Sequence, residues 1–471
     1  MAARGYVTDT SYTDQFFREL SPAWLNYTAS LNGVAPRPLD GGFVYLELGC
    51  GFGTSTVVNA GAFPRGEFHG CDIIAAHIEG GRRHAAALGV ENVVFHEADF
   101  DQLLARGLPP CDFIVLHGVY SWVDAGARAA VRRVIRALLK PAGLAYVSYN
   151  CLPGWATEAP LRKLLVELST AEDGDTARRT AAALEALTAF SRARPRYFKA
   201  NPSAVTAVEA YNRRDTQYVV HEFMNEAWQP FYSVDVADDL AEIGLRYAGS
   251  ATLAENHPAL VLDAESAKAV GALATDRQRQ LAADFATNQR FRRDVFVRDD
   301  DGSARARGEA AFAAVVGCAR PPSAIEARAT VPRGEIAFHD GFIRDVRALM
   351  ARGSLTIADA VASLSAHGGS ADEIARNLIF LVAAGVLVPF AQAYPVADGS
   401  RRLRATPMLE RALALVLDEG KGCSVPSEVM GNGFPLEPAD ARGVRAALEG
   451  RPTDEHTREL LATLARIGLM V

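Results

Sequence analysis

The sequence predicts an α/β fold built on a doubly wound, mostly parallel sheet, followed by a mainly α C-terminal half. Three observations carry this prediction. Short apolar strands alternate with helical patterns over the first 150 residues, a glycine-rich turn follows the first strand, and helical periodicity dominates beyond residue 300. Alternating strands and helices favour a parallel sheet that is covered on both faces. Such sheets bind ligands beyond the carboxyl ends of their strands.

The strands of this sheet can be placed in order along the chain. Five candidates fall in the first 150 residues, at 43–48, 67–72, 92–99, 112–118 and 143–149. Two later candidates, at 245–253 and 291–298, could close the far edge of the sheet. The helical and more charged stretch between about 155 and 230 would then be an insertion.

The C-terminal half shows helix, glycine turn, helix and strand in "TIADAVASLSAHGGSADEIARNLIFLVAAGVLVPFA", an order like that of a winged helix. We therefore divide the chain into five expected domains. They are a ligand-binding core (1–155), a helical insertion serving as lid or dimerisation element (156–230), the rest of the sheet (231–300), a middle domain with the winged-helix-like module (301–400) and a C-terminal helical domain (401–471).

Composition narrows the class of protein. The 471 residues are 49% hydrophobic and 22% charged, as in an ordinary globular protein, and the net charge of −7 argues against a nucleic-acid binder. Six cysteines without a C-x-x-C pair favour reduced thiols in a cytoplasmic protein. The longest apolar run, at 378–391, is shorter than the ~20 residues that span a bilayer. We expect no membrane segment, no nucleic-acid partner and, since no metal-ligand spacing occurs, no metal.

The stretch "YLELGCGFGTST" (45–56) carries the main functional signal. Gly49, Gly51 and Gly53 allow a tight turn and the close approach of a ligand, and the helix that begins near Thr54 would aim free N–H groups at it. The spacing is not the G-x-G-x-x-G of dinucleotide-binding folds. Glu47 would repel a pyrophosphate and suits an ammonium or hydroxyl group, such as the amino-acid end of S-adenosylmethionine.

The next strand ends supply partners for such a ligand. Asp72 follows Gly53 by 19 residues, the distance expected of an acid that binds ribose hydroxyls. Asp99 and Phe100 end the third strand and suit the amino group and the flank of an adenine. Either aspartate alone could be a helix N-cap, but four matching strand ends in order favour a methyl-donor site.

The first 150 residues resemble class I S-adenosylmethionine-dependent methyltransferases, with "ELGCGFG" as the donor loop. "HGVYSWV", "VSYNCLPGW", "HEFMNEAWQPFYSVDVADDLAEIGLRYAGSA" and "NQRFRRDVFVR" resemble methyltransferases that carry a methyltransferase regulatory domain, and the domain order is similar to that of rickettsial protein-lysine methyltransferases. The resemblance implies a Rossmann-like sheet and S-adenosyl-L-methionine as cofactor. The donor residues that we predict are Glu47, Gly49, Cys50, Gly51, Gly53, Asp72, Ile73, Asp99, Phe100 and His117.

Methyl transfer is an in-line displacement in which the protein mainly positions the nucleophile. Aromatic rings at the ends of the fourth and fifth strands could lower the pKa of an acceptor lysine and hold its methylated product. Each ring could equally be core packing. We predict His117, Tyr120, Tyr149 and Asn150 as catalytic residues, and Trp122, Trp155 and Trp228 as the substrate pocket. Tyr6, Tyr12, Phe16 and Phe17 offer an N-terminal flap over the donor or a buried helix face.

Three functions of different classes remain from the sequence. The first is a protein methyltransferase acting on lysine, with the second half as surface for a macromolecule or a homodimer partner. The second is a small-molecule O- or N-methyltransferase, in which His117 would act as base. The third is a donor-sensing DNA-binding regulator. Against it, residues 340–391 carry four arginines and five acids, whereas phosphate contacts need several cations.

Overall fold

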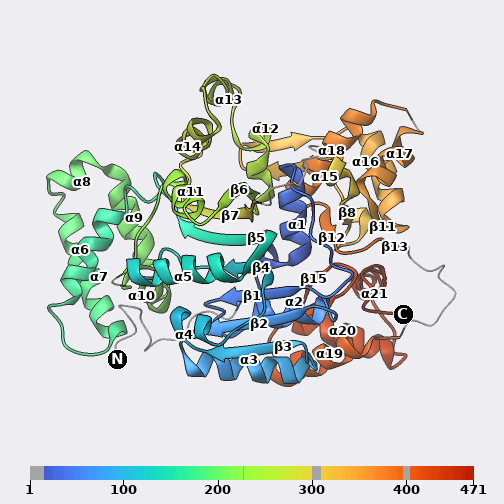
Figure 1. The fold of residues 1–471 in the computed structure, drawn as a ribbon, viewed down its shortest axis with the longest axis horizontal. Helices are drawn as coiled ribbons and strands as arrows, with labels where there is room; N and C mark the ends of the chain where they lie inside the picture. The colour runs from blue at the N-terminus through green and yellow to red at the C-terminus, as the bar shows by residue number, and fades with distance from the viewer. Residues whose placement is uncertain (1–14, 226, 300–308, 367, 396–403) are drawn as a thin grey trace.

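The computed structural model describes residues 15–471 except 226, 300–308, 367 and 396–403 (Figure 1). Its centre is a seven-stranded sheet in the order β3-β2-β1-β4-β5-β7-β6. The strands are β1 (Val44–Leu48), β2 (Glu67–Asp72), β3 (Val93–Glu97), β4 (Cys111–Leu116), β5 (Leu139–Asn150), β6 (Leu245–Ser250) and β7 (Phe291–Arg298). The first five are parallel, and β7 runs antiparallel between β5 and β6. The predicted fold class is confirmed, and the two late strands do close the far edge.

Alternation along the strands assigns side chains to the two faces of the sheet. Tyr45, Phe68 and Phe113 pack into one core cluster together with α1 (Pro22–Leu31), α2 (Thr54–Ala62) and α3 (Ala75–Leu88). Leu46, Leu48, Ile114 and Leu116 pack into a second cluster with α4 (Phe100–Ala105), α5 (Ala125–Leu138) and α11 (Ser233–Ala241). Successive side chains of a strand point to opposite faces, so both faces are buried under helices.

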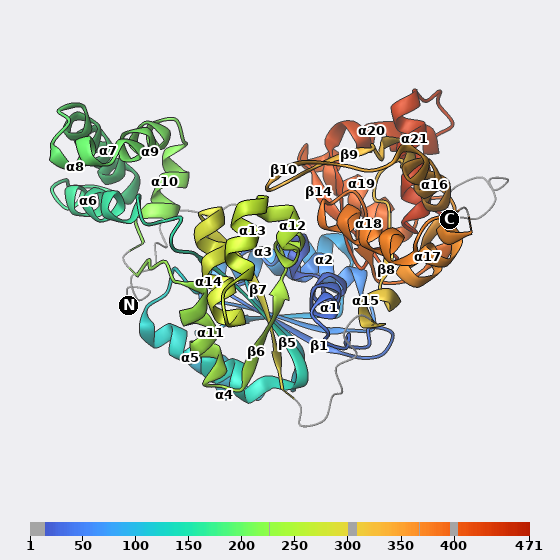
Figure 2. The same cartoon turned by 90° about the horizontal axis from the view of Figure 1, so that it is seen from above.

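The helices between β5 and α11 form a helical insertion that stands apart from the sheet in Figure 2. It contains α6 (Ala159–Ser169), α7 (Thr176–Arg192), α8 (Arg196–Ala200), α9 (Pro202–Asn212) and α10 (Thr216–Phe223). Leu165, Leu187, Phe198 and Val208 belong to its own buried cluster, which reaches the sheet through Trp155. Between β6 and β7 lie η2 (Leu253–Asn256), α12 (Pro258–Val261), α13 (Ala264–Gly271) and α14 (Asp276–Thr287).

The C-terminal half is mostly helical, as predicted, with small antiparallel sheets. Its helices are α15 (Glu309–Ala313), η3 (Pro322–Ala324), α16 (Asp340–Met350), α17 (Ile357–Ser365), α18 (Ala371–Ala383), α19 (Pro407–Glu419), α20 (Pro438–Leu448) and α21 (Glu455–Arg466). Its strands are β8 (Val315–Gly317), β9 (Arg328–Val331), β10 (Gly334–Ala337), β11 (Gly353–Thr356), β12 (Val388–Phe390), β13 (Tyr394–Pro395), β14 (Cys423–Ser427) and β15 (Asn432–Leu436). Helix, turn, helix and strand follow one another at α17, α18 and β12. The winged-helix assignment of this module stays a prediction.

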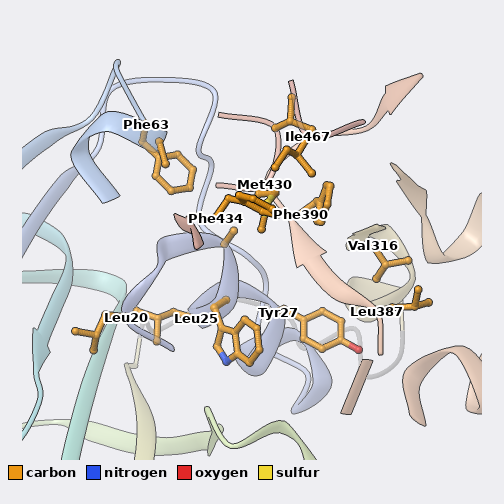
Figure 3. Packing of buried hydrophobic residues seen from close by; sticks show 14 of the residues in the cluster. Leu20, Leu25, Tyr27, Phe63, Val316, Leu387, Phe390, Met430, Phe434 and Ile467 are labelled. Atoms are coloured by element: carbon orange, nitrogen blue, oxygen red, sulfur yellow. The ribbon is translucent and has the colours of Figure 1, made fainter. Parts of the chain in front are cut away.

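The two halves share one apolar core, drawn in Figure 3. Leu25 and Tyr27 of α1 and Phe63 at the end of α2 lie in the same cluster as Phe390 and Phe434 of the C-terminal half. A Cβ atom at Gly431 would lie 2.6–3.2 Å from Ala391, Phe63 and Ala23, so glycine permits the close approach. The helices α1 and α2 therefore pack between one side of the sheet and the C-terminal half. η1 (Arg18–Leu20) precedes α1 and adds Leu20 to this core.

A buried charge cluster joins β7 to α14 at the far edge of the sheet. The Arg292 guanidinium is 2.5 Å from Asp284 and 2.9 Å from Asp294, and all three side chains are buried. Tyr149 donates a hydrogen bond to Asp294 at 2.5 Å. Because buried charges require partners, the cation balances two carboxylates that water does not reach.

We expect Arg292→Met to lower the free energy of unfolding by about 3 kcal/mol or more, because it leaves two buried carboxylates without their cation. Thermal and urea unfolding followed by circular dichroism would measure this. The matched control is Arg246→Met on β6, whose ion pair with Asp299 is more exposed and whose loss should change stability by less than about 1 kcal/mol. Equal effects of the two substitutions would contradict the expectation.

Candidate functional site

The glycine turn after β1 has the backbone that its sequence predicts. Gly49, Gly51 and Gly53 have φ values of +69°, +54° and +70°, a region that residues with a Cβ atom adopt reluctantly. A Cβ at Gly53 would come within 2.4 Å of the Phe95 ring, whereas a Cβ at Gly51 would meet nothing within 4 Å. Gly53 is therefore required for packing, and Gly51 borders open space.

Asp72, at the carboxyl end of β2, holds this turn in place. Its Oδ2 accepts the Gly51 N–H at 2.9 Å, and its Oδ1 accepts the Ile74 N–H at 2.9 Å. His77 Nδ1 lies 3.2 Å from the same Oδ1. A carboxylate offers about four acceptor sites, so one on Oδ2 stays available for a further donor such as a ribose hydroxyl.

A cavity opens beyond the carboxyl ends of β1, β2, β3 and β4, the place where the sheet predicts a ligand. Of the predicted donor residues, its wall includes Gly49, Gly51, Asp72, Ile73, Asp99, Phe100 and His117. Asp99 caps α4 by accepting the Gln102 N–H through Oδ1, which leaves Oδ2 for a ligand. The side chain of Ile73 is 51% exposed, as expected of an apolar group that would flank a flat ring.

The other predicted donor residues lie behind this wall. Glu47 is buried and accepts the Thr56 hydroxyl at 2.6 Å, and desolvation raises the pKa of its carboxyl to about 7. Cys50 is buried near Gly70, and Gly53 packs against Phe95. These residues shape the turn from beneath. Strand alternation turns Glu47 toward α2 and away from the cavity.

A second cavity adjoins the first, and the two share His117, Gly118 and Trp122. It lies between the end of β5, the helical insertion and the start of β7. Its remaining wall is formed by Asn150, Trp155, Glu158, Ala207, Ala210, Tyr211, Arg214, Glu222, Phe223, Arg290 and Phe291. The predictions from the sequence assign the first cavity to a methyl donor and residues of the second to its acceptor, and the shared residues make the two cavities neighbours. We refer to the two as the donor cavity and the acceptor cavity.

The acceptor cavity combines aromatic walls with carboxyl groups. Burial raises the pKa of Glu222 to about 7, and the neighbouring Asn150 amide and Arg290 charge oppose the rise. The Asn150 Nδ2 is buried, and among the described residues no acceptor takes its N–H groups with standard hydrogen-bond geometry. Arg290 pairs with Glu158 and lies 4.0 Å from the Trp155 ring centre. The cavity thus offers an ionisable carboxyl, an amide donor and aromatic faces.

His117 stands at the junction of the two cavities but is poorly suited to act as a base. Its Nδ1 is 2.9 Å from the Tyr146 hydroxyl, and Phe17 stacks on its ring at 3.9 Å. Burial and the charge of Arg293 lower the pKa of His117 to about 3. A group with so low a pKa accepts protons weakly at neutral pH. Of the other predicted flap residues, Phe16 contacts the region of Gly433, and Tyr6 and Tyr12 lie outside the described residues.

Three further predicted residues do not line either cavity. Tyr120 donates its hydroxyl hydrogen to Asp239 at 2.7 Å, on the face of the sheet that α5 and α11 cover. Tyr149 points to the same face because it alternates with Ser148 and Asn150 along β5. Trp228 packs edge-on against Trp155 at 5.0 Å and supports it from behind. Trp122, Trp155 and Asn150 line the second cavity together, whereas Tyr120, Tyr149 and Trp228 lie outside it.

Several residues of the site were not predicted from the sequence. His77 reaches Asp72 from α3, and Glu158, Tyr211, Glu222 and Arg290 reach the acceptor cavity from four separate elements. Only Glu222 carried a usable signal, as an acid next to aromatic and apolar residues in "HEFMNEAW". The others are single charged or aromatic residues that no motif marks in the sequence.

Two sequence families match this chain. The family described as "Methyltransferase domain" matches residues 39–221, and that described as "Predicted methyltransferase regulatory domain" matches residues 215–298. An uncharacterized protein of Synechocystis sp. is 31% identical over 390 residues, which cover 82% of this chain and 76% of that protein. An uncharacterized protein of Rickettsia prowazekii is 27% identical over 289 residues, 59% of this chain and 50% of that protein.

The solved structure of PKMT2 from Rickettsia typhi in complex with AdoHcy has the same fold. Its TM-score to this chain is 0.70 at 18% sequence identity, and the match covers 97% of this chain and 92% of that one. The segment that matches the regulatory-domain family supplies α10, β6 and β7. In the present protein, that segment is part of the central sheet and of the acceptor-cavity wall.

We expect Asp72→Ala to weaken the binding of S-adenosylmethionine and S-adenosylhomocysteine by about 10- to 100-fold, because it removes a charged acceptor and frees the turn at Gly51. Calorimetric titration would measure the dissociation constants. Asp418→Ala, an exposed acid on α19, is the control and should bind both ligands as the wild type does. Unchanged affinity in Asp72→Ala would rule out this donor site.

Proposed function

Because this chain belongs to the S-adenosylmethionine-dependent methyltransferases that carry a methyltransferase regulatory domain, we propose that it methylates lysine side chains of proteins. S-adenosylmethionine, its cofactor, supplies an electrophilic methyl group on a sulfonium. The residues of the donor cavity fit S-adenosylmethionine, since they offer a glycine turn, two carboxylates with free acceptor sites (Asp72 and Asp99) and the apolar side chain of Ile73. The acceptor cavity decides which nucleophile receives the methyl group.

One observation carries the proposal: the acceptor cavity that adjoins the donor cavity holds the ionisable carboxyl of Glu222 among aromatic rings. A lysine brings an ammonium to the enzyme, and an ammonium pairs with carboxylates and with aromatic faces. Trp155, Tyr211 and Phe223 supply such faces on the cavity wall.

The chemistry of a lysine acceptor also suits Glu222. The amine must lose a proton before it can act as nucleophile, and from a pKa near 10.4 this costs about 4.6 kcal/mol at pH 7. A carboxyl with a pKa of about 7 can both accept and release a proton at neutral pH, as a general base must. Glu222 would take the ammonium proton, and the buried Asn150 amide beside it would orient the carboxylate.

The low pKa of His117 argues against the alternative, an O-methyltransferase with a histidine base. His117 would instead form part of the wall between donor and acceptor, held by Tyr146 and Phe17. The similarity in fold to PKMT2 from Rickettsia typhi supports the proposal only through a shared architecture, since the identity is 18%. The methylated product would keep its charge and its contact with the aromatic rings.

We expect Glu222→Gln to lower kcat for lysine methylation by about 100-fold, because it removes the base and keeps the shape of the side chain. In the wild type kcat should rise with pH around 7, since the Glu222 carboxyl is protonated and inactive as a base below its pKa of about 7. The Gln variant should lose that inflection. Transfer of labelled methyl groups to lysine peptides, followed from pH 5.5 to 9, would measure both effects.

Glu185→Gln, at an exposed position on α7 of the same insertion, is the matched control and should behave as the wild type. A panel of small amines, phenols and alcohols should be assayed in parallel with the peptides. Efficient methylation of a small molecule and none of peptide or protein lysine would overturn the proposal. Unchanged kcat and pH profile in Glu222→Gln would remove Glu222 from the mechanism.

A further inference from the structure

We propose that the groove between α7 and α9 binds an acidic stretch of the protein substrate, close to the lysine that enters the acceptor cavity. This inference rests on the proposed function, since it names the kind of protein that presents the lysine. It assigns a role to a surface of the helical insertion that the chemistry of methyl transfer does not use.

The insertion carries a local excess of positive charge on a chain whose net charge is −7. Between positions 190 and 215 the basic residues are Arg192, Arg194, Arg196, Lys199, Arg213 and Arg214, and the acids are Glu209 and Asp215. All six basic side chains are exposed. The exposed rings of Phe190 and Tyr197 lie in the same stretch. Folding therefore leaves a basic and partly aromatic surface on a net acidic protein.

Three of these cations line one groove. Arg192, Arg194 and Arg213 form its rim, together with polar and apolar side chains of both helices, namely Thr188, Ser191, Val205, Thr206, Val208, Glu209 and Asn212. Within the part of the chain that the structure describes, no carboxylate forms an ion pair with any of the three. Exposed arginines elsewhere do find partners, as Arg277 does with Asp238. Three unpaired guanidinium groups around a groove are suited to carboxylates from another molecule.

The position of the groove connects it to catalysis. α9 separates the groove from the acceptor cavity, with Val208, Glu209 and Asn212 on the groove side and Ala207, Ala210 and Tyr211 on the cavity side. One helix thus forms a wall of both. A chain segment with its lysine in the acceptor cavity would continue over α9, where acidic residues a few positions away would meet the arginines.

Charge and shape favour an acidic polypeptide over a nucleic acid. Nucleic-acid binding draws on contacts to several successive phosphates along an extended basic surface. Here the basic groove is short, contains the acid Glu209, and is bounded by a net acidic chain that would repel a long polyanion. A short run of aspartates or glutamates would match three arginines without reaching the acidic remainder.

The test uses three fluorescein-labelled peptides of equal length, each with one central lysine. The lysine is flanked by Asp and Glu in the first peptide, by Ser and Gly in the second and by Arg in the third. A single-stranded DNA oligonucleotide matched in charge to the acidic peptide is the fourth probe. Binding is measured by fluorescence anisotropy and methyl transfer by radiolabel, with the full-length protein. The variants are Arg192→Gln/Arg194→Gln/Arg213→Gln and the charge reversal Arg192→Glu/Arg194→Glu/Arg213→Glu.

The matched control removes three exposed cations of the C-terminal half, in Arg333→Gln/Lys421→Gln/Arg442→Gln. We expect the acidic peptide to bind the wild type and the control equally. The groove Gln variant should bind it about tenfold more weakly, as expected for the loss of three exposed ion pairs. In methyl transfer the loss should appear in KM and not in kcat, and the charge-reversed variant should prefer the Arg-flanked peptide.

Each alternative outcome overturns a separate idea. Equal binding of the acidic peptide by wild type and groove variant, or an equal loss with the control variant, would refute the groove. Tighter, groove-dependent binding of the oligonucleotide than of the acidic peptide would replace the inference with nucleic-acid binding. Groove-dependent binding of the acidic peptide without methylation of any peptide would uphold the groove and overturn lysine methylation.

Discussion

The site depends on one hydrogen bond, from the Gly51 N–H to the carboxylate of Asp72. It ties the turn after β1 to the end of β2, and the Gly49 and Cys50 N–H groups strengthen the link by donating to the Cys71 carbonyl. These bonds form because β1 and β2 pair in parallel with Leu48 opposite Cys71, so that both strands end at the same level. The glycine turn, the start of α2 and the donor cavity are positioned together by this link.

The acceptor side is built by a different part of the chain. Glu222 and Phe223 come from α10, and Tyr211 comes from α9. Phe291 is the first residue of β7, and Arg290 directly precedes it. β7 is held in the sheet by its pairing with β5 and β6 and by the buried cluster around Arg292. The segment that matches a regulatory-domain family thus completes the sheet and forms part of the wall of the second cavity, where we propose that the acceptor binds. Residues of this segment line the acceptor cavity, and none is among the described residues that line the donor cavity, so a change in its packing would act directly on the acceptor cavity.

Local patterns explain which predictions succeeded. The strands and the glycine turn depend on short-range signals such as apolar runs and glycine spacing, and the structure has them where they were expected. Asp72 and Asp99 lie on the cavity wall, and their roles toward the donor stay predictions. The predictions for Tyr120 and Tyr149 depended on which face of the sheet a side chain takes, and both point to the helix-covered face. Glu222, Glu158 and Arg290 lie far apart in the sequence, so no local pattern could join them.

The sequence by itself determined the fold class, the donor turn and the strand ends that surround it, because alternation and glycine spacing act over a few residues. Only the tertiary structure decided which side chains share the acceptor cavity and which arginines of the insertion stay unpaired. It also decided that the C-terminal half covers α1 and α2 through a common core. Those outcomes depend on contacts between segments that are far apart in the sequence, and the short-range patterns of alternation and glycine spacing do not encode such contacts.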